Sequence, residues 1–311
     1  MGSVFCFLLS AFCLLPTQGR LDRVEQEEKP VGLPNFFKLS NNIYSGGEPD
    51  GEKAFQSLQR LGVKTIISVD GARPDVETAC KYGMRYVHFP MGYDGCPRPR
   101  ALEIARAVRD LPKPVYIHCH HGKHRGPTAA AIARIVVDGI SHEQAIAEMK
   151  RAGTDPRYVG LYADVRNFRK PTKAELDRAS NKFPSVAPVP PFRRAMVDID
   201  HRHTALKQSQ AEGWQPPKDH PDINPPHEAL QLMQAFRELN RSPEVQKRPA
   251  DFRQMMIDSE QGAAQLEQAL RRLATGDASA AVAADQAFTV IDRACTACHV
   301  KYRNVPRKGR G

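Results

Sequence analysis

The stretch His118-Cys119-His120-His121-Gly122-Lys123-His124-Arg125 places a cysteine and an arginine at the two ends of a loop long enough to wrap one phosphate group. The run 114–118 before it is short, apolar and typical of a strand. The run 126–135 after it has helical character, with Pro127 in its first turn. The loop is therefore predicted to join a strand to a helix N-terminus, where backbone N–H groups and the helix dipole favour an anion.

Two side chains of this loop suit phosphoryl transfer. Cys119 lies in the positive field of the predicted helix N-terminus, so we expect a thiolate that acts as a nucleophile. The guanidinium of Arg125 can give two parallel hydrogen bonds to phosphate oxygens and stabilise the charge that develops during transfer. We expect both residues to be catalytic. The residues between them are expected to surround the phosphate: His120, His121, Gly122, Lys123 and His124.

Two other interpretations of the loop are open. Its histidines and its cysteine are possible ligands for a metal ion, although the charges of Lys123 and Arg125 oppose a cation. The second alternative is a buried cysteine with an unrelated arginine nearby. It does not explain why His, Cys, Gly and Arg all fall in register on one strand–loop–helix unit. Phosphate is the favoured ligand.

The pattern His-Cys-x5-Arg, with a glycine three residues after the cysteine, resembles the signature of the cysteine-dependent protein tyrosine and dual-specificity phosphatases. Residues 42–49 and 61–69 resemble the opening of small atypical dual-specificity phosphatases, and the likeness runs from about residue 36 to 171. It implies hydrolysis of phosphomonoesters through a phosphocysteine intermediate. The implied substrate is a phosphorylated protein or a small anionic phosphate, and residues 122–125 are similar to the loop of atypical members that act on inositol phosphates.

The resemblance also implies an aspartic acid, on a separate loop before the nucleophile, that protonates the leaving oxygen. Asp94 is the first candidate, because Gly and Pro residues mark 90–97 as a loop after a predicted strand. Asp70, at the end of another predicted strand, is the second candidate. A solvated turn residue is the alternative interpretation of Asp94.

One position departs from the phosphatase pattern. The family usually has Ser or Thr directly after the arginine, where the hydroxyl assists breakdown of the phosphocysteine. Gly126 stands at this position. Hydrolysis of the intermediate is therefore expected to be slow unless Thr128, two residues further on, substitutes.

Strand-type and helix-type segments alternate through the N-terminal half. We expect strands at 43–45, 64–69, 84–89 and 114–118, with helices between them and a further helix that begins with a capping box at Ser141. This alternation predicts an α/β fold, a mostly parallel sheet with flanking helices, whose chemistry lies at the carboxyl ends of the strands.

Cys295-Thr296-Ala297-Cys298-His299 is the second motif that carries chemistry. Two thiols one helical turn apart can add to the vinyl groups of haem, while the adjacent histidine ligates iron. A redox dithiol and a zinc site are the alternatives, but no second cysteine pair is present for zinc. We therefore expect a covalent haem c held by Cys295 and Cys298, with His299 as the ligand of the metal.

The sequence around this motif is helical. Apolar residues recur at three-to-four spacing over 193–210, 227–240, 249–275 and 278–303. The stretch from about 195 to 303 resembles the cytochrome c-prime class, which implies an all-α, four-helix-bundle-like domain and a redox partner. No methionine follows His299, so a sixth ligand must come from upstream. The open candidates are Met196, His201, His203, His227 and Met233.

The whole chain, at 311 residues, is long enough for two domains. The predicted division is a signal peptide at 1–19, a dual-specificity phosphatase-like domain at 36–171, a Pro-rich basic linker at 172–194 and a c-type cytochrome helical domain at 195–311. The apolar run 4–15 is too short to span a bilayer and precedes small residues at a cleavage site. We expect export, to the periplasm or beyond, and no stable membrane span afterwards. No basic residue precedes the run, so an uncleaved anchor is the alternative.

Charge and cysteine content add two expectations. The formal net charge of +10 favours an anionic partner, but the basic residues are scattered without interleaved aromatics, so a nucleic-acid partner is not expected. Cys80 and Cys96 are predicted to be small core residues, and a reversible disulfide between Cys96 and Cys119 is the alternative. A rival function for the whole chain is a haem electron-transfer or sensor protein whose phosphatase-like domain only binds phosphorylated ligands.

Overall fold

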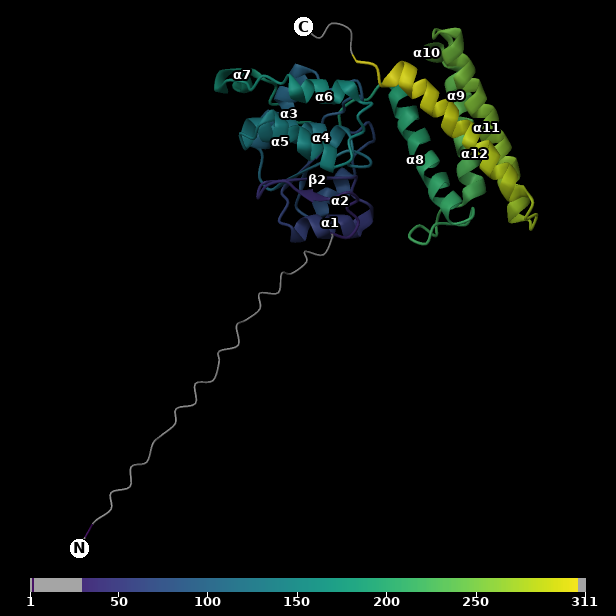
Figure 1. Ribbon diagram of the computed structural model, residues 1–311, viewed down its shortest axis with the longest axis horizontal. Helices are drawn as coiled ribbons and strands as arrows, with labels where there is room; N and C mark the ends of the chain where they lie inside the picture. The colour runs from purple at the N-terminus through teal and green to yellow at the C-terminus, as the bar shows by residue number, and fades with distance from the viewer. Residues whose placement is uncertain (1, 3–29, 307–311) are drawn as a thin grey trace.

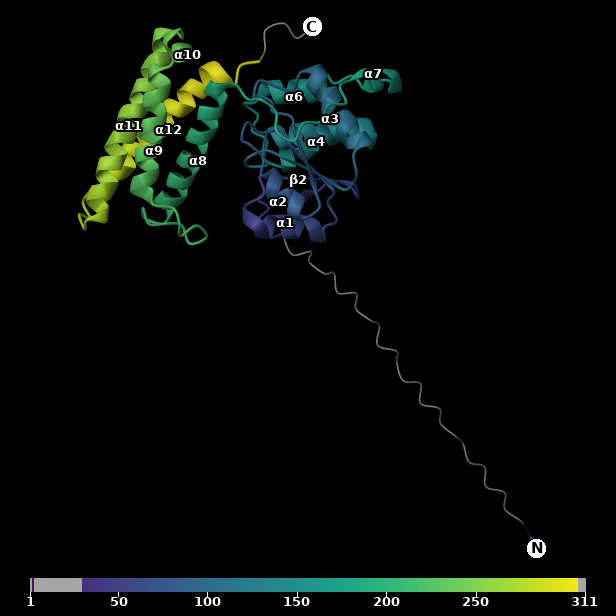
Figure 2. The same cartoon turned by 180° about the vertical axis from the view of Figure 1, so that it is seen from behind.

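The structure is a computed structural model that describes residue 2 and residues 30–306 (Figures 1 and 2). An α/β part and a helical part lie side by side (Figure 1). The predicted signal peptide falls outside the described residues except for residue 2. None of the described helices combines the length and the apolar character that crossing a bilayer requires.

A five-stranded sheet forms the centre of the α/β part, in the order β1-β2-β5-β3-β4. Its strands are β1 Phe37–Lys38, β2 Ile43–Gly46, β3 Thr65–Ser68, β4 Arg85–His88 and β5 Val115–His118. Strand β1 runs antiparallel to β2, and the other neighbours are parallel. The predicted α/β fold with a mostly parallel sheet is confirmed.

Helices cover both faces of this sheet: α1 Gly51–Arg60, α2 Val76–Lys81, α3 Arg98–Asp110, α4 Arg125–Val137, α5 His142–Arg151 and α6 Val159–Arg166. Alternate strand residues enter two separate cores, as the two-residue period of a strand requires. Ile67 and Ile117 pack with α3 and α4, whereas Ile66 and Tyr116 pack with α1. Helix α4 is rich in alanine and buried along most of its length, so the helix that follows the phosphate loop is fixed within the core.

The strand register brings the functional loop to the middle of the sheet edge. Strand β5 lies between β2 and β3, and His118 pairs with Gly46 on one side and Ser68 on the other. The carboxyl ends of three parallel strands therefore meet where the loop 119–124 leaves the sheet, the usual position of a ligand site in such folds.

The predicted linker is packed against the α/β part. It contains α7, Lys173–Arg178, whose Asp177 pairs with Arg109 of α3 at 2.7 Å. Further on, the backbone N–H of His88 donates to the Pro184 carbonyl at 2.8 Å. An ion pair and a strand-edge hydrogen bond therefore hold the predicted linker against the α/β part at these points.

The helical part contains α8 Pro191–Ala211, α9 Pro225–Arg241, α10 Pro243–Gln246, α11 Ala250–Ala274 and α12 Ala280–Cys298, followed by the π-helical turn η1, His299–Arg303. The four long helices share one apolar core, to which Leu206, Phe236, Leu266 and Ile291 contribute. Gly262 allows helices α11 and α12 to approach closely, since a Cβ at this position would lie 2.9 Å from Ile291 Cγ1. The helices occupy the segments predicted to be helical, and the relation to cytochromes stays a prediction.

Candidate active site

The phosphate loop starts from a rigid base. His118, the last residue of β5, is buried, and its Nε2 lies 2.6 Å from the hydroxyl oxygen of Tyr86. Burial lowers the pKa of His118 to about 4, so this imidazole is neutral. Cys119 follows directly and is itself 3% exposed, so its sulfur lies at the bottom of the loop.

Gly122 allows the loop to lie against the end of β2. Its φ is +67°, and a Cβ built there would lie 2.3 Å from the carbonyl carbon of Gly46. Both the left-handed backbone and this close approach require glycine. The backbone N–H of Gly122 closes the turn by donating to the Cys119 carbonyl at 3.2 Å.

Arg125 is the first residue of α4 and turns its guanidinium back toward the loop. Its Nη2 donates to Asp70 Oδ2 at 3.2 Å and to the hydroxyl oxygen of Tyr93 at 3.1 Å. Its Nε is buried and makes no hydrogen bond to any residue between 30 and 306. A buried N–H without an acceptor is costly, so this donor indicates a site for an anion beside the loop.

Asp70 organises the loop from the end of β3. It is 1% exposed, and its Oδ2 accepts hydrogen bonds from the backbone N–H of His120 and from Arg125. Burial alone would raise the pKa of Asp70, but the charges of Arg125 and His120 hold it well below the ordinary value. A carboxyl group kept ionised has no proton to give. Asp70 therefore positions the loop and Arg125, which counts against Asp70 as the general acid.

Asp94 lies in the loop between β4 and α3, where Gly92 and Gly95 form a β-bridge. It is partly buried and lines a cavity of about 400 Å³ together with Tyr93 and Arg125. The first candidate for the acid therefore shares a cavity with the arginine that is predicted to bind phosphate. Its role in proton transfer stays a prediction.

The side chains predicted to surround the phosphate point in several directions. His120 and His124 are partly buried, whereas His121 and Lys123 are exposed. Burial and the neighbouring Arg125 lower the pKa of His124 to about 4, and its ring packs on Tyr158 at 4.5 Å between centroids. The Lys123 side chain lies beside Gly153. The loop therefore offers backbone N–H groups and Arg125 to an anion more directly than it offers Lys123.

Gly126, which stands where the phosphatase pattern has Ser or Thr, and Thr128, its possible substitute, have different surroundings. A Cβ at Gly126 would lie 3.4 Å from Cys119 Sγ, so this position borders the nucleophile. Thr128, two residues further along α4, is fully buried, and its hydroxyl donates to the His124 carbonyl at 2.9 Å. The proton of that hydroxyl is engaged within the helix, which does not favour Thr128 as the substitute.

The two predictions for cysteines outside the motifs have opposite outcomes. Cys96 is buried in the apolar cluster that also contains Cys119, as expected of a core residue. Cys80 is exposed, so its assignment to the core was wrong. It lies near the end of the short helix α2, which buries Ala79 instead.

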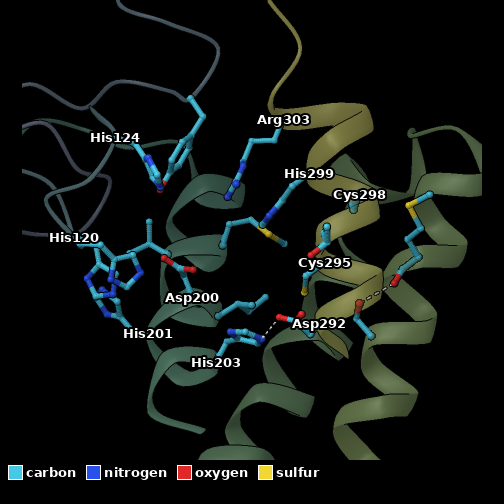
Figure 3. A pocket seen from close by; sticks show the side chains of 18 of the residues that line it. His120, His124, Asp200, His201, His203, Asp292, Cys295, Cys298, His299 and Arg303 are labelled. Atoms are coloured by element: carbon cyan, nitrogen blue, oxygen red, sulfur yellow. Dashed lines mark hydrogen bonds and ion pairs between the residues drawn. The ribbon is translucent and has the colours of Figure 1, made fainter. Parts of the chain in front are cut away.

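The phosphate loop and the Cys-x-x-Cys-His motif line the same cavity of about 280 Å³ (Figure 3). Arg125 and His120 contribute from the α/β part, and Cys295, Cys298 and His299 from the helical part. Arg303 of η1 also reaches across. Its guanidinium carbon lies 4.2 Å from the Tyr93 ring centroid, and its Nη2 donates to the Tyr158 hydroxyl oxygen at 3.1 Å. Sequence analysis missed this contact of Arg303, because nothing in the pattern relates it to the loop.

The residues around the second motif fit a haem. Burial raises the pKa of the Cys295 thiol to about 12 and lowers that of His299 to about 3, so the imidazole is neutral and able to ligate a metal. Apolar side chains line the cavity beside them: Ile199, Phe236, Met255 and Met256.

Three of the five candidate sixth ligands line this cavity, namely Met196, His201 and His203. The other two candidates are not among the residues that line it. His227 is exposed and lies 2.9 Å from the side-chain nitrogen of Gln231, while Met233 packs against the bundle core. His203 Nε2 is buried 3.4 Å from Asp292 Oδ1 but makes no hydrogen bond within the described residues.

Comparison with known proteins gives a match to phosphatases. The chain is 32% identical over 146 residues to the dual specificity protein phosphatase TpbA of Pseudomonas aeruginosa strain UCBPP-PA14. The chain is similar to dual-specificity phosphatases. This match covers 43% of the chain and spans 65% of the length of TpbA. It supports the presence of a phosphatase-like domain, as the resemblance of residues 118–125 predicts.

A second relative and one solved structure are also similar to part of the chain. The chain is 29% identical over 151 residues to the inositol diphosphatase DSP4 of Arabidopsis thaliana, across 43% of this chain and 74% of that protein. The crystal structure of P. aeruginosa TpbA shares 29% identity with a TM-score of 0.39, across 44% of this chain and 86% of that one. No family model matches the chain.

Proposed function

We propose that the chain is an exported phosphomonoester hydrolase of the dual-specificity type that also carries a covalent haem c. The observation that supports the first part best is the arrangement of Cys119 and Arg125. Both lie at one helix N-terminus, Asp70 holds Arg125 in place, and the buried Nε of Arg125 lacks an acceptor. A phosphate oxygen would satisfy that donor.

The first chemical step uses residues of the α/β part alone. The Cys119 thiolate attacks phosphorus, the bond to the ester oxygen breaks, and Asp94 gives that oxygen a proton. The loop N–H groups and the Arg125 guanidinium stabilise the charge on the phosphoryl oxygens in the transition state. The products are an alcohol or phenol and a phosphocysteine at Cys119.

The second step returns the enzyme to its starting state. Asp94, now ionised, accepts a proton from water, which attacks phosphorus and releases inorganic phosphate and the Cys119 thiolate. A hydroxyl beside the sulfur normally assists this step in the resembling family. Gly126 supplies none, so breakdown of the phosphocysteine is the slow step.

The substrate class follows from what surrounds the loop. The similar proteins are named as a protein phosphatase and an inositol diphosphatase, so both substrate types are candidates. In this chain the loop opens into a cavity that the helical part also lines, with Arg303 at its border. An opening bordered by both parts of the molecule favours a small phosphate ester over a folded phosphoprotein.

The helical part is proposed to hold haem through Cys295 and Cys298, and His299 would be a ligand of its iron. When bound, the group would supply one-electron chemistry or binding of a small gas, and a redox partner belongs to this proposal. Burial keeps His299 neutral, and the same cavity offers apolar surface from Ile199, Phe236, Met255 and Met256.

The experiment is to express the full chain together with a haem-attachment system and purify it. Its absorption spectrum is recorded, and phosphate release is measured from phosphopeptides, aryl phosphates and inositol phosphates, with Cys119→Ser as the blank. Phosphate release by the wild type alone supports the hydrolase. The rival, a haem protein that only binds phosphorylated ligands, predicts binding or one burst of product without further turnover, and Gly126 is the observation in its favour.

A further inference from the structure

A second group of polar side chains lies between the two parts of the molecule, at the phosphate loop. Glu48 follows β2, His120 belongs to the loop, and His201 comes from α8. Glu48 Oε2 lies 3.1 Å from His120 Nδ1 and 3.8 Å from His201 Nε2. The two imidazole rings have centroids 4.4 Å apart and lie beside each other at the edge of the cavity (Figure 3).

We propose that Glu48, His120 and His201 form a site for a divalent transition-metal ion such as Zn²⁺, which fastens α8 to the phosphate loop. Two imidazoles and one carboxylate are a ligand set that zinc uses, with a fourth position left open to water or substrate. The side chains are 30%, 18% and 40% exposed, so an ion can enter from solvent.

The distances match those of a metal site. Zinc binds nitrogen and oxygen at about 2.0–2.1 Å in a tetrahedron, which places neighbouring ligand atoms about 3.3 Å apart. The three ligand atoms of this cluster lie within 4.8 Å of one another, and the two distances from Glu48 fall on either side of the tetrahedral value.

An ion pair alone does not explain the cluster. The contact of Glu48 with His120 satisfies one imidazole, but His201 Nε2 is buried and makes no hydrogen bond to any described residue. At 3.8 Å the carboxylate is beyond hydrogen-bond reach of that nitrogen. A metal ion that binds the lone pair of His201 Nε2 removes this unsatisfied group.

The charges around the cluster also favour a cation. In the sequence, Lys123 and Arg125 oppose a metal in the loop. In the structure the Lys123 side chain lies beside Gly153, and Arg125 pairs with Asp70. The structure brings in carboxylates instead: Glu48 belongs to the cluster, and Asp200 lies close to His120 and His121.

The test measures zinc binding to the full chain after treatment with a chelator, by equilibrium dialysis and metal analysis. Wild type should bind one zinc ion. His201→Ala, in the helical part, and Glu48→Gln, in the α/β part, should each weaken the zinc affinity at least tenfold. His220→Ala is the matched control. It removes another histidine at the same interface, 3.4 Å from Asp50 Oδ2, and should bind zinc as the wild type does.

Two further measurements keep the result unambiguous. Zinc should raise the thermal midpoint of the wild type and of His220→Ala, and leave that of His201→Ala unchanged, because only binding to the folded state stabilises it. The series is repeated with Cys295→Ala and Cys298→Ala present, which removes the thiols as zinc ligands and excludes a role of His201 at haem. Equal zinc affinity in wild type, His201→Ala and Glu48→Gln would overturn the proposal.

Discussion

Asp70 Oδ2 lies 3.2 Å from Arg125 Nη2, and both side chains are almost fully buried. The same carboxylate oxygen accepts the backbone N–H of His120. One residue at the end of β3 therefore fixes both the arginine and the backbone of the phosphate loop, which makes the loop rigid before any ligand arrives.

Asp70→Asn should destabilise the protein by about 3–5 kcal/mol, because it leaves the buried Arg125 without its counter-charge. The pKa of Asp70 is depressed in the folded state, so its contribution to stability is fully present above the ordinary value of 3.8 and lost as the pH falls below it. Urea unfolding of both proteins from pH 7 to pH 3 checks this. The difference in unfolding free energy should be largest at pH 7 and shrink on acidification, and a constant difference would contradict the account.

Asp94→Asn should slow alkyl phosphate hydrolysis by about 100-fold and affect activated aryl esters far less, since only the poorer leaving group needs a proton. Initial rates with the two ester types measure the contrast. Asp94 shares its cavity with Arg125 but lies on a different loop, so phosphate affinity should hardly change. Equal slowing of both ester types would assign the acid to another residue.

Gly126→Ser should speed breakdown of the phosphocysteine, by about tenfold for a hydroxyl that stabilises the transition state by roughly 1.4 kcal/mol. The new Cβ would lie 3.4 Å from Cys119 Sγ, which brings the hydroxyl next to the sulfur. Stopped-flow release of an aryl product separates the burst from steady turnover, and only the steady rate should rise. Thr128→Val is the control. If that variant loses turnover, Thr128 already acts as the substitute.

The haem proposal predicts an absorbance that stays with the denatured chain. Cys295→Ala combined with Cys298→Ala should abolish it, and His299→Ala should leave haem attached weakly or not at all, because iron loses its axial ligand. Cys80→Ala, which changes an exposed cysteine, is the control and should behave as the wild type. Extraction of all haem from the wild type by acid and acetone would refute covalent attachment.

Local patterns predicted the α/β part well because each signal there depends on neighbouring residues. The alternation of strands and helices, the glycine at 122 and the helix start at 125 are all properties of short segments. The position of Asp94 on a loop followed from its Gly and Pro neighbours in the same way.

Contacts between distant segments were not predictable. The approach of Arg303 to Tyr93 and of His201 to Glu48 depends on how the helical part lies against the sheet, which no local pattern encodes. Cys80 was wrongly predicted to be a core residue because it is small and apolar. It lies near the end of the short helix α2, where it is exposed. The composition of the predicted linker likewise does not reveal the ion pair between Asp177 and Arg109.

The most direct test of the central claim is to stop the reaction of an aryl phosphate by rapid acid quench and map the covalent phosphate by peptide mass spectrometry. Wild type should carry one phosphoryl group on the peptide that contains Cys119, at high occupancy because Gly126 slows its release. Cys119→Ser should bind phosphate esters yet release no product, and Cys80→Ser should match the wild type. Undiminished turnover by Cys119→Ser, or a phosphoryl group on another residue, would contradict the account.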